Sequence, residues 1–284
     1  LPISLAFACL KALPSWCLIS VHFFSFFYSF ETRKLFFNFT VGMASRILHS
    51  ECNSGSTSNE SKLVRPKLER LKITNRSEMV TEAQTLMAKH AANKSVLEME
   101  YANEAGIGLG PTMEFYATMC KQLQKKTLYM WMAATTSSSS EQEEEYVKTQ
   151  HGLFPSALPL VAADKGKVLN LFATLGRVIG KAIEDGRLLD IPLSPALVKL
   201  VLTNNSEQKL LQWADYAHID TALYNSMQEL VKIREQVKRA KSKEQVAKMA
   251  QVIDNMCLSF SVMGIELVPN GASKDVTVEN YEEF

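Results

Sequence analysis

The stretch "GIGLGPTMEFYATMCKQL", Gly106 to Leu123, contains the sharpest turn signal in the chain. The segment "SVLEMEY" (Ser95 to Tyr101) comes just before it, and its apolar residues alternate with two glutamates, which predicts a half-buried strand. Gly106, Gly108 and Gly110 can take positive φ angles, so the chain can turn sharply here into a helix. The spacing therefore predicts a strand, a tight turn and a helix.

The helix after the glycines is predicted to be amphipathic. Pro111 suits the first helical position because its missing N–H would have no partner there. Met113, Tyr116, Cys120 and Leu123 then recur at spacings of three and four residues, which places them on one apolar face.

A glycine-rich turn between a strand and a helix can also bind phosphate, so two nucleotide motifs are considered. A dinucleotide fingerprint needs G-x-G-x-x-G, but the third glycine position is occupied by Pro111. Near the expected acidic position stand Lys125, Lys126 and Thr127, and the G-K-[ST] of a P-loop is absent. The sequence favours a structural turn, and no cofactor is expected.

Two further helices are predicted around this core. Ser77 is a plausible N-cap for the helix in "SEMVTEAQTLMAKHA". In the segment from Gly166, a wide apolar stripe comprises Val168, Leu171, Phe172, Leu175, Val178, Ile179, Ala182 and Ile183. Gly176 and Gly180 leave a notch in which another helix could approach closely, and Gly186 is expected to end the helix.

The rest of the chain predicts more helices and a few short strands. Ser194 and Pro195 look like the N-cap and first residue of another helix. Residues 224–256 form a mostly helical stretch, and Cys257 is expected to open a β-prone run, "CLSFSV". The run "IELV" is followed by a "PNG" turn. The predicted fold class is α+β, mainly helical, and it is not a regular βαβ alternation.

Composition shifts divide the chain. Residues 1–48 are a Phe-rich helical lead-in, residues 49–66 a polar linker and residues 67–284 the main domain, with a mobile acidic loop at 133–150. Nine of the fourteen phenylalanines occur by residue 39. A basic region before the apolar run is missing, which argues against a secretory signal. We expect a hydrophobic helix packed in a larger protein, and membrane attachment is the minority alternative.

Charge and cysteine content bound the function. The formal net charge of +1 gives no field that would favour nucleic acid or an acidic membrane. The basic segment 232–248 could bind nucleic acid or a membrane surface. It lacks aromatic residues for base stacking, so a solvated helix face is favoured. The cysteines are odd in number, form no C-x-x-C pair and predict a reducing compartment, the cytoplasm or nucleus: Cys9, Cys17, Cys52, Cys120 and Cys257.

No chemical site is predicted from the residues themselves. Each cysteine lies in an apolar segment or has no neighbouring base in sequence, so none is expected to be a nucleophile. The five histidines have no metal-ligand spacing, so no metal is expected: His22, His49, His90, His151 and His218.

Three segments in the same order resemble the N-terminal lobe of HECT-type ubiquitin-protein ligases. They are "AGIGLGPTMEFYATM", "LFATLGRVIGKAIEDGRLLDIPLSPALVKLVL" and "IELVPNGASKDVTVENYEEF". The resemblance runs from about Lys67 to Phe284. "LPSWC", "FETRKLFF" and "GLFP" are similar to the subgroup with armadillo-type repeats, which includes plant ligases. The motif residues carried over are Gly106, Gly108, Gly110, Glu114, Phe115, Gly176, Gly180, Gly186, Asp190 and Asn280.

The resemblance implies a mechanism and partners. Enzymes of this family accept ubiquitin from an E2 conjugating enzyme onto a cysteine and transfer it to a substrate lysine, which splits one difficult acyl transfer into two easier ones. The family's catalytic cysteine stands in a Thr-Cys context before Leu-Pro, and none of the five cysteines here has that context.

The family's E2-docking subdomain follows the "VT-EN" block, at which this chain stops. We therefore expect an incomplete N-lobe, with no catalytic residue of its own. The alternative is a non-catalytic interaction module derived from such a ligase. The substrate, the E2 and the chain linkage are not predicted.

Overall fold

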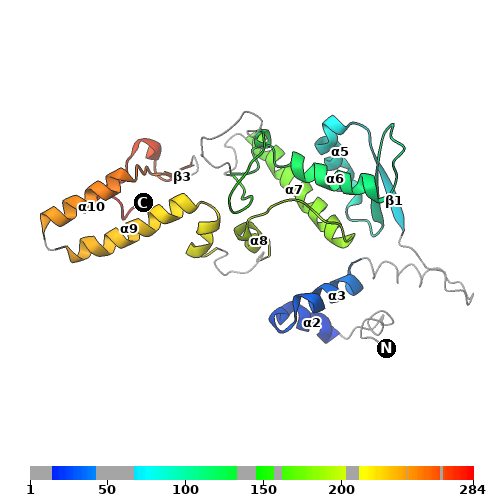
Figure 1. The fold of residues 1–284 in the computed structure, drawn as a ribbon, viewed down its shortest axis with the longest axis horizontal. Helices are drawn as coiled ribbons and strands as arrows, with labels where there is room; N and C mark the ends of the chain where they lie inside the picture. The colour runs from blue at the N-terminus through cyan, green and yellow to red at the C-terminus, as the bar shows by residue number, and fades with distance from the viewer. Residues whose placement is uncertain are drawn as a thin grey trace, which may run out of the picture. The chain divides into compact units, whose positions relative to one another are not determined.

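A computed structural model of the chain describes residues 15–42, 67–132, 145–156, 162–202, 211–240, 242–262 and 265–284. The chain divides into two units, one of residues 1–123 and 166–191 and the other of residues 124–165 and 192–284. Helices dominate both units and the strands are few and short (Figure 1), so the predicted α+β class is confirmed.

The Phe-rich lead-in is helical where the structure describes it. It contains α2 (Ser15–Phe23), the short 3-10 helix η1 (Ser25–Phe27) and α3 (Phe30–Thr40). Ser29 caps α3, because its hydroxyl accepts a hydrogen bond from the Thr32 N–H at 3.2 Å. Within the described ranges, every helix is too short or too polar to cross a bilayer. The predicted linker at 49–66 lies outside the described residues, and the domain limits stay predictions.

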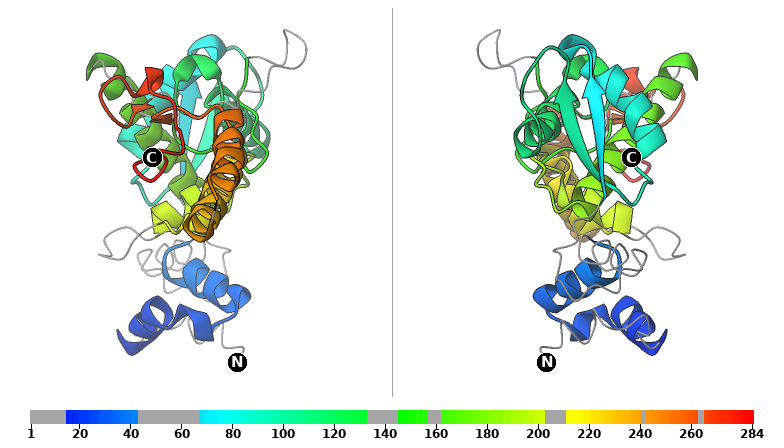
Figure 2. Two further views of the ribbon diagram at one scale, coloured as in Figure 1. Left: turned by 90° about the vertical axis from the view of Figure 1, so that its left-hand side faces the viewer. Right: turned by 90° about the vertical axis from the view of Figure 1, so that its right-hand side faces the viewer.

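A parallel strand pair forms the centre of the first unit. β1 (Leu68–Ile73) pairs with β2 (Val96–Tyr101) in parallel, and α5 (Met79–His90) connects them (Figure 2). A parallel pair requires such a crossover, because its strands run in the same direction. Side chains of β1, β2 and α5 form a buried core: Leu71, Ile73, Met79, Ala83, Met87, Leu97, Met99 and Tyr101.

The start of α5 differs from the prediction. The 3-10 helix η2 (Arg76–Glu78) precedes α5, and Asn75 caps η2 by accepting a hydrogen bond from the Ser77 N–H at 2.9 Å. Ser77 is therefore the donor at this cap, and its prediction as the N-cap is wrong. Glu82 accepts hydrogen bonds from the N–H groups of Thr74 and Asn75 at 2.7 and 2.9 Å, which fixes the turn from within the helix.

The helix after the glycines, α6, spans Leu109–Gln122 and presents the predicted apolar face. Tyr116, Cys120 and Leu123 are buried, as expected. Pro111 is the third helical residue, so its predicted first position is wrong. The helix can begin earlier because Gly108, at φ +84°, occupies its N-cap.

The central helix α7 spans Ala162–Glu184. Five residues of the predicted stripe are buried: Val168, Leu171, Leu175, Val178 and Ala182. Ile183 is 55% exposed, so its assignment to the stripe is wrong. Gly186, at φ +65°, ends the helix as predicted. The Arg187 N–H donates to the Ala182 carbonyl and the Gly186 N–H to the Ile183 carbonyl, at 2.7 and 3.3 Å, which is the Schellman pattern.

In the second unit, the segment after α6 folds back on itself. It includes the 3-10 helix η3 (Lys126–Leu128), and a bridge joins Lys125 to Tyr146 at the end of the predicted acidic loop. Residues 133–144 of that loop lie outside the described residues. Gly152, at φ +89°, passes so close to the chain at Pro192 that a Cβ would lie 2.8 Å from its carbonyl oxygen.

The helix α8 begins as predicted. It spans Pro195–Leu202, and the Ser194 hydroxyl accepts a hydrogen bond from the Leu197 N–H at 3.2 Å. The 3-10 helix η5 (Trp213–His218) follows, and its Asp215 side chain lies 2.5 Å from the Lys199 ammonium.

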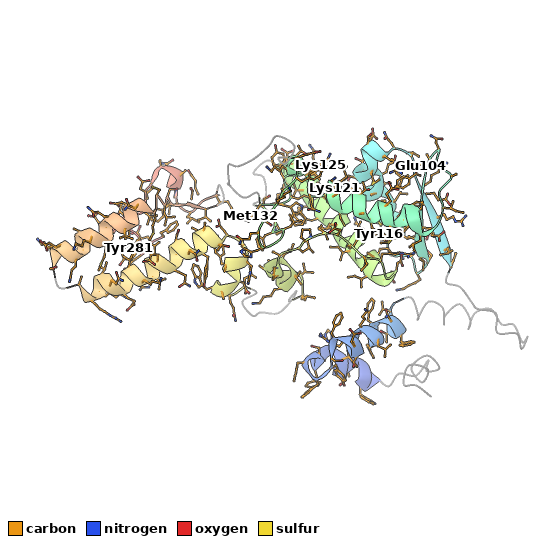
Figure 3. All side chains as sticks on the ribbon, viewed as in Figure 1. Glu104, Tyr116, Lys121, Lys125, Met132 and Tyr281 are labelled. Carbon is orange, nitrogen blue, oxygen red and sulfur yellow. The ribbon has the colours of Figure 1, made fainter. Side chains whose placement is uncertain are left out.

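The predicted helical stretch 224–256 is two helices. α9 (Thr221–Arg239) ends before Ser242, which caps α10 (Lys243–Asn255). The two helices pack with the C-terminal segment around a core of Leu230, Ile233, Ile253, Phe260 and Val276. Tyr281 packs against this core from the C-terminal segment (Figure 3).

The C-terminal strands are shorter than predicted. β3 (Ser261–Val262) pairs antiparallel with β4 (Ile265–Glu266), and the 3-10 helix η6 (Gly271–Ser273) follows. Cys257 was expected to open a strand, but it is exposed in a turn at φ 48°, so that prediction is wrong. The predicted "PNG" turn is confirmed, because Asn270 adopts a left-handed conformation at φ 58°.

Gly271→Ala is expected to destabilise the protein. A Cβ at this position would lie 2.2 Å from the Phe260 carbonyl oxygen, which forces a backbone shift at a cost of about 1–3 kcal/mol. The matched control is Gly110→Ala, because no atom lies within 4 Å of its Cβ position and alanine favours a helix. Urea unfolding of both variants measures the difference. Equal unfolding free energies for the two variants would contradict the close approach at Gly271.

Candidate functional site

The glycine turn is tied to the edge of β2 by one threonine. The Thr112 hydroxyl donates a hydrogen bond to the Gly108 carbonyl at 2.7 Å and accepts one from the Met99 N–H at 2.9 Å. Gly108 has the predicted positive φ, whereas Gly106 and Gly110 do not. The turn thus depends on one glycine and on a buried hydroxyl that satisfies a strand donor.

The other residues of the turn motif have packing and surface contacts. A Cβ on Gly106 would lie 3.2 Å from the Pro111 ring, and Phe115 is fully buried. The Phe115 ring contacts the ring of Tyr116 edge-on, with centroids 5.5 Å apart. Figure 3 labels Tyr116 on α6.

Glu114 belongs to an ion-pair cluster on the surface of the first unit. The Arg76 guanidinium bonds to Glu114 and to both carboxylate oxygens of Glu104, the latter at 2.8 Å, and it lies 3.9 Å from the centroid of the Tyr101 ring. The hydrogen bond from Arg76 lowers the pKa of Glu104, and burial raises the pKa of Tyr101 to about 12. Arg76 is 44% exposed, so solvent weakens these ion pairs.

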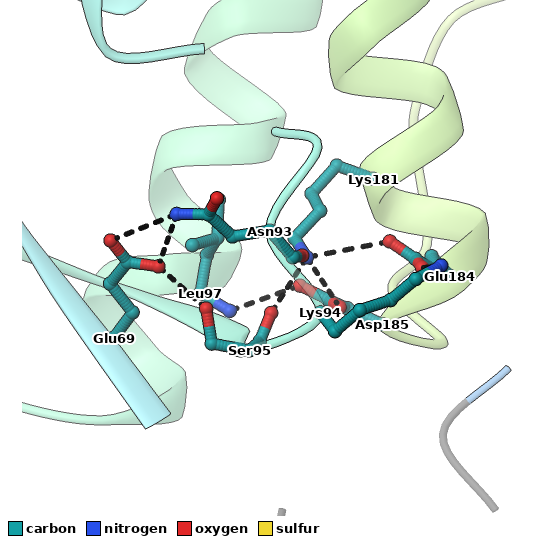
Figure 4. Close-up of polar contacts among 8 residues, drawn as sticks. All are labelled: Glu69, Asn93, Lys94, Ser95, Leu97, Lys181, Glu184 and Asp185. Atoms are coloured by element: carbon teal, nitrogen blue, oxygen red, sulfur yellow. Dashed lines mark hydrogen bonds and ion pairs between the residues drawn. The ribbon is translucent and has the colours of Figure 1, made fainter. Parts of the chain in front are cut away.

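A buried lysine holds the loop that leads into β2 (Figure 4). The Lys181 ammonium, with its side chain fully buried, donates hydrogen bonds to the carbonyls of Asn93 and Ser95 at 2.8 and 2.7 Å. Carboxylate oxygens of Glu184 and Asp185 lie 3.4 and 3.5 Å from it. The buried charge is therefore compensated by two carboxylates and two carbonyl oxygens.

Asp185 also caps the edge of β2. Its second carboxylate oxygen accepts a hydrogen bond from the Leu97 N–H at 3.1 Å, while Thr112 accepts from the Met99 N–H. These two donors point away from β1. Thr112 of α6 and Asp185, the residue after α7, thus accept hydrogen bonds from two N–H groups of this strand edge that would otherwise be buried without partners.

Glu69 of β1 binds the side chains of the same loop (Figure 4). Its carboxylate accepts hydrogen bonds from the Ser95 hydroxyl at 2.5 Å and from the Asn93 amide at 3.0 Å, and its other contact is the His90 ring at 2.6 Å. The bonds from Ser95 and Asn93 lower the pKa of Glu69 to about 2. Glu69 of β1 thus binds the side chains of the loop, and Lys181 of α7 binds its carbonyl groups. We call this arrangement the polar clamp.

The remaining motif residues are dispersed. Gly176 and Gly180 are exposed, and apart from the backbone of α7 itself no described atom lies within 4 Å of their Cβ positions, so no described helix uses the notch. The Asp190 main chain hydrogen-bonds the thiol of Cys120. Asn280 lies in the second unit.

Asn280 closes the C-terminal turn. Its side chain accepts a hydrogen bond from the Thr277 N–H at 2.7 Å and donates one to the Asp275 carbonyl at 3.0 Å. The carried-over residues therefore do not gather at one site, and each role described for them concerns backbone geometry, packing or surface pairing.

The two cysteines whose thiols the structure describes differ in burial. Burial raises the pKa of the Cys120 thiol to about 11, which disfavours the thiolate. Cys257 is exposed and its thiol donates to the Asp254 carbonyl at 3.7 Å. In the ranges that the structure describes, His, Cys, Asp and Glu side chains form no group of three or more that could hold a metal ion.

Comparison with known proteins identifies the family. Residues 117–284 match the model of the HECT domain, described as a ubiquitin-transferase. The chain belongs to the HECT-domain family. The sequence-based resemblance is thereby confirmed, whereas the armadillo-type subgroup is not tested.

Several curated HECT-family relatives cover nearly the whole chain. It is 32% identical to E3 ubiquitin-protein ligase UPL3 of Arabidopsis thaliana over 97% of this chain and 16% of that protein. It is 30% identical to E3 ubiquitin-protein ligase TRIP12 of Danio rerio, over 96% of this chain and 15% of the relative. Ubiquitin fusion degradation protein 4 of Saccharomyces cerevisiae is 30% identical over 96% of the chain and 19% of its own length. The chain thus spans less than a fifth of these relatives.

The polar clamp of the HECT chain could not be found from the sequence. Thr112, Lys181 and Asp185 lie inside the motif segments, but nothing local indicates their roles, because the groups of β2 and of the loop before it that they bind lie 13 to 88 residues away in the sequence. Glu69 lies outside the motifs, and its partner Ser95 is 26 residues away. The only local hint is that Lys181 interrupts an apolar helical stripe. Sequence reasoning located the glycine turn but missed the side chains that fasten it.

Lys181→Met is expected to destabilise the first unit by about 3–5 kcal/mol. The substitution keeps the side-chain volume but leaves Asp185 as a buried charge and two carbonyls without their donor. Lys94→Met is the matched control, because Lys94 also pairs with Glu184, at 3.3 Å, but is 78% exposed. Urea unfolding followed by circular dichroism measures both. A loss below about 1 kcal/mol for Lys181→Met would contradict the clamp.

Glu69 is expected to make stability depend on pH in the acid range. The pKa of Glu69 in the folded protein, about 2, lies below the ordinary value of 4.5. The stabilisation that ionised Glu69 adds to the folded protein is therefore complete above pH 4.5 and is lost as the pH falls toward 2. The urea midpoint of the wild type should exceed that of Glu69→Gln above pH 4.5, and the difference should shrink below it. Glu279→Gln, at an exposed carboxylate, controls for general charge effects. A difference that is constant with pH would contradict the assignment.

Proposed function

We propose that this chain is the N-lobe portion of a HECT-type ubiquitin ligase. In the whole protein, ubiquitin passes from an E2 to a cysteine as a thioester and then to a substrate lysine. The observation that supports this proposal is the HECT-domain match over residues 117–284, joined to relatives that align along nearly the whole chain. The thiol serves the reaction as a good nucleophile and then as a good leaving group.

In this proposal the chain supplies the scaffold and not the catalytic thiol. Burial raises the pKa of the Cys120 thiol to about 11, which disfavours the thiolate. The Thr-Cys context of the family is absent from all five cysteines. The proposal assigns the catalytic cysteine and E2 docking to other parts of the whole ligase, of which the UPL3 relative is covered to 16% by this chain.

The partners follow from the same assignment. E2 and ubiquitin act with the whole ligase, in the cytoplasm or nucleus, and the substrate protein is not specified. Residues 67–284 make up the N-lobe portion, residues 1–48 the helical lead-in and residues 49–66 the linker.

A second candidate function is a non-catalytic interaction module. It is favoured by the exposed aromatic side chains of η1, where Phe26 and Phe27 are each 75% exposed. Such a module would bind a partner protein without any transfer of ubiquitin.

A ubiquitin-charging assay separates the two candidates. The purified chain, mixed with a ubiquitin-charged E2, is expected to give no thiol-sensitive adduct on a non-reducing gel, because none of its cysteines stands in the Thr-Cys context of the family. The natural full-length protein is expected to form one. An adduct on the chain that disappears in Cys257→Ala would contradict the scaffold role. Failure of the full-length protein to accept ubiquitin would contradict the ligase proposal and favour the interaction module.

A further inference from the structure

The two edges of the β1–β2 sheet differ in whether their outward main-chain groups have hydrogen-bond partners. On the β2 side, the outward N–H groups of Leu97 and Met99 are satisfied by Asp185 and Thr112, as described above. The β1 side is the other edge of the same two-stranded sheet, and β1 is drawn in cyan beside β2 in Figure 2.

The hydrogen-bond pattern identifies which groups of β1 face outward. The Val96 N–H donates to the Lys67 carbonyl and the Ala102 N–H to the Ile73 carbonyl, both at 2.8 Å. Because main-chain groups alternate in direction along a strand, residues 67, 69, 71 and 73 face β2. The N–H and C=O groups of residues 68, 70 and 72 therefore point away, and no other described strand pairs with them.

The side chains along this edge are exposed. Leu68 is 46% exposed, the Arg70 side chain is 55% exposed, and Lys72 is also exposed. These three residues share the open face of the sheet, while Leu71 and Ile73 point into the core. A further strand could approach the edge without displacing a buried residue.

Charges on the open face are arranged in columns. Arg70 stands opposite Glu98 and Lys72 opposite Glu100 in the register of the sheet. The Arg70 Nε lies 3.3 Å from Glu98 and 3.5 Å from Glu100, so one arginine is shared by both carboxylates. For Lys72, no ion pair with a described residue is found. Lys72 is thus the basic side chain of this edge that is left to meet an acidic group of a partner.

We propose that the outer edge of β1 binds an extended acidic segment of a partner protein as a third strand. Main-chain hydrogen bonds to residues 68, 70 and 72 supply the affinity, and acidic side chains opposite Arg70 and Lys72 supply the selectivity. The resulting sheet has an acidic strand on either side of the basic strand β1.

A second copy of this chain fits the edge poorly. Antiparallel pairing of two β1 strands through their outward groups, centred on the edge, would place Arg70 opposite Arg70 and Lys72 opposite Leu68. Like charges directly opposite each other are unfavourable. Charged edge residues can also serve only to prevent such association, and binding to a peptide distinguishes that role from a docking site.

The test uses the whole chain and a defined probe. The probe is a fluorescein-labelled peptide of eight residues in which Glu and Val alternate, and the control peptide has Gln in place of Glu. Fluorescence polarisation at low ionic strength is expected to show saturable binding of the Glu peptide and at least tenfold weaker binding of the Gln peptide. Absence of saturable binding, or equal binding of the two peptides, would overturn the proposal.

Two variants localise the binding. Lys72→Pro removes an N–H that points away from β2, so the strand pair can persist while the peptide loses a donor. It is expected to weaken binding at least tenfold, with the circular dichroism spectrum unchanged. If the proline variant does not fold, Lys72→Glu tests the site instead, and it should weaken binding of the Glu peptide at least fivefold. The matched control, Lys238→Glu on the exposed face of α9, should leave that binding unchanged.

The location is wrong if Lys72→Glu and Lys238→Glu have the same effect on peptide binding. The choice of partner is wrong if light scattering shows a dimer of the chain that Lys72→Glu abolishes. Either result would overturn the proposal, since the first removes the site and the second replaces the acidic partner by another copy.

Discussion

The buried ammonium of Lys181 is the interaction on which the first unit depends. Its side chain is fully buried at the end of α7, and it holds the carbonyls of Asn93 and Ser95, just before β2. A buried charge is tolerated only where its hydrogen bonds and counter-charges are complete. The end of α7 therefore cannot move away from this loop without separating the buried ammonium from its two carbonyl acceptors. Because Asp185 follows on the same helix end, its cap on the Leu97 N–H is positioned by the same constraint.

The glycine turn of the family motif has a structural role in this arrangement. The glycine turn lacks both phosphate-binding motifs, and it joins the edge of β2 to α6 through Thr112 and Gly108. The ion pairs of Arg76 with Glu104 and Glu114 then connect the turn to the start of α5 on the surface. In this HECT-family chain, the turn region is thus held by backbone geometry and side-chain hydrogen bonds.

The sequence predicted those features that local chemistry determines. The alternation in β2, the left-handed Gly186 and the Ser194 cap each depend on a few adjacent residues, and each is confirmed. Features set by distant contacts were missed, because Lys181 reads as an ordinary helical lysine and its carbonyl partners are 86 and 88 residues away. The predicted cap at Ser77 does not form; Asn75 caps η2 instead, and Glu82 from within α5 binds the main chain of Thr74 and Asn75 beside it.

The central claim is that the sheet has one edge capped by buried side chains and one open edge. Native-state amide hydrogen exchange measured by NMR tests it most directly. The Leu97 and Met99 amides should exchange only at rates close to global unfolding, because their acceptors are the buried Asp185 and Thr112. The Arg70 and Lys72 amides should exchange orders of magnitude faster. Similar protection at both edges, or fast exchange at Leu97, would contradict the account.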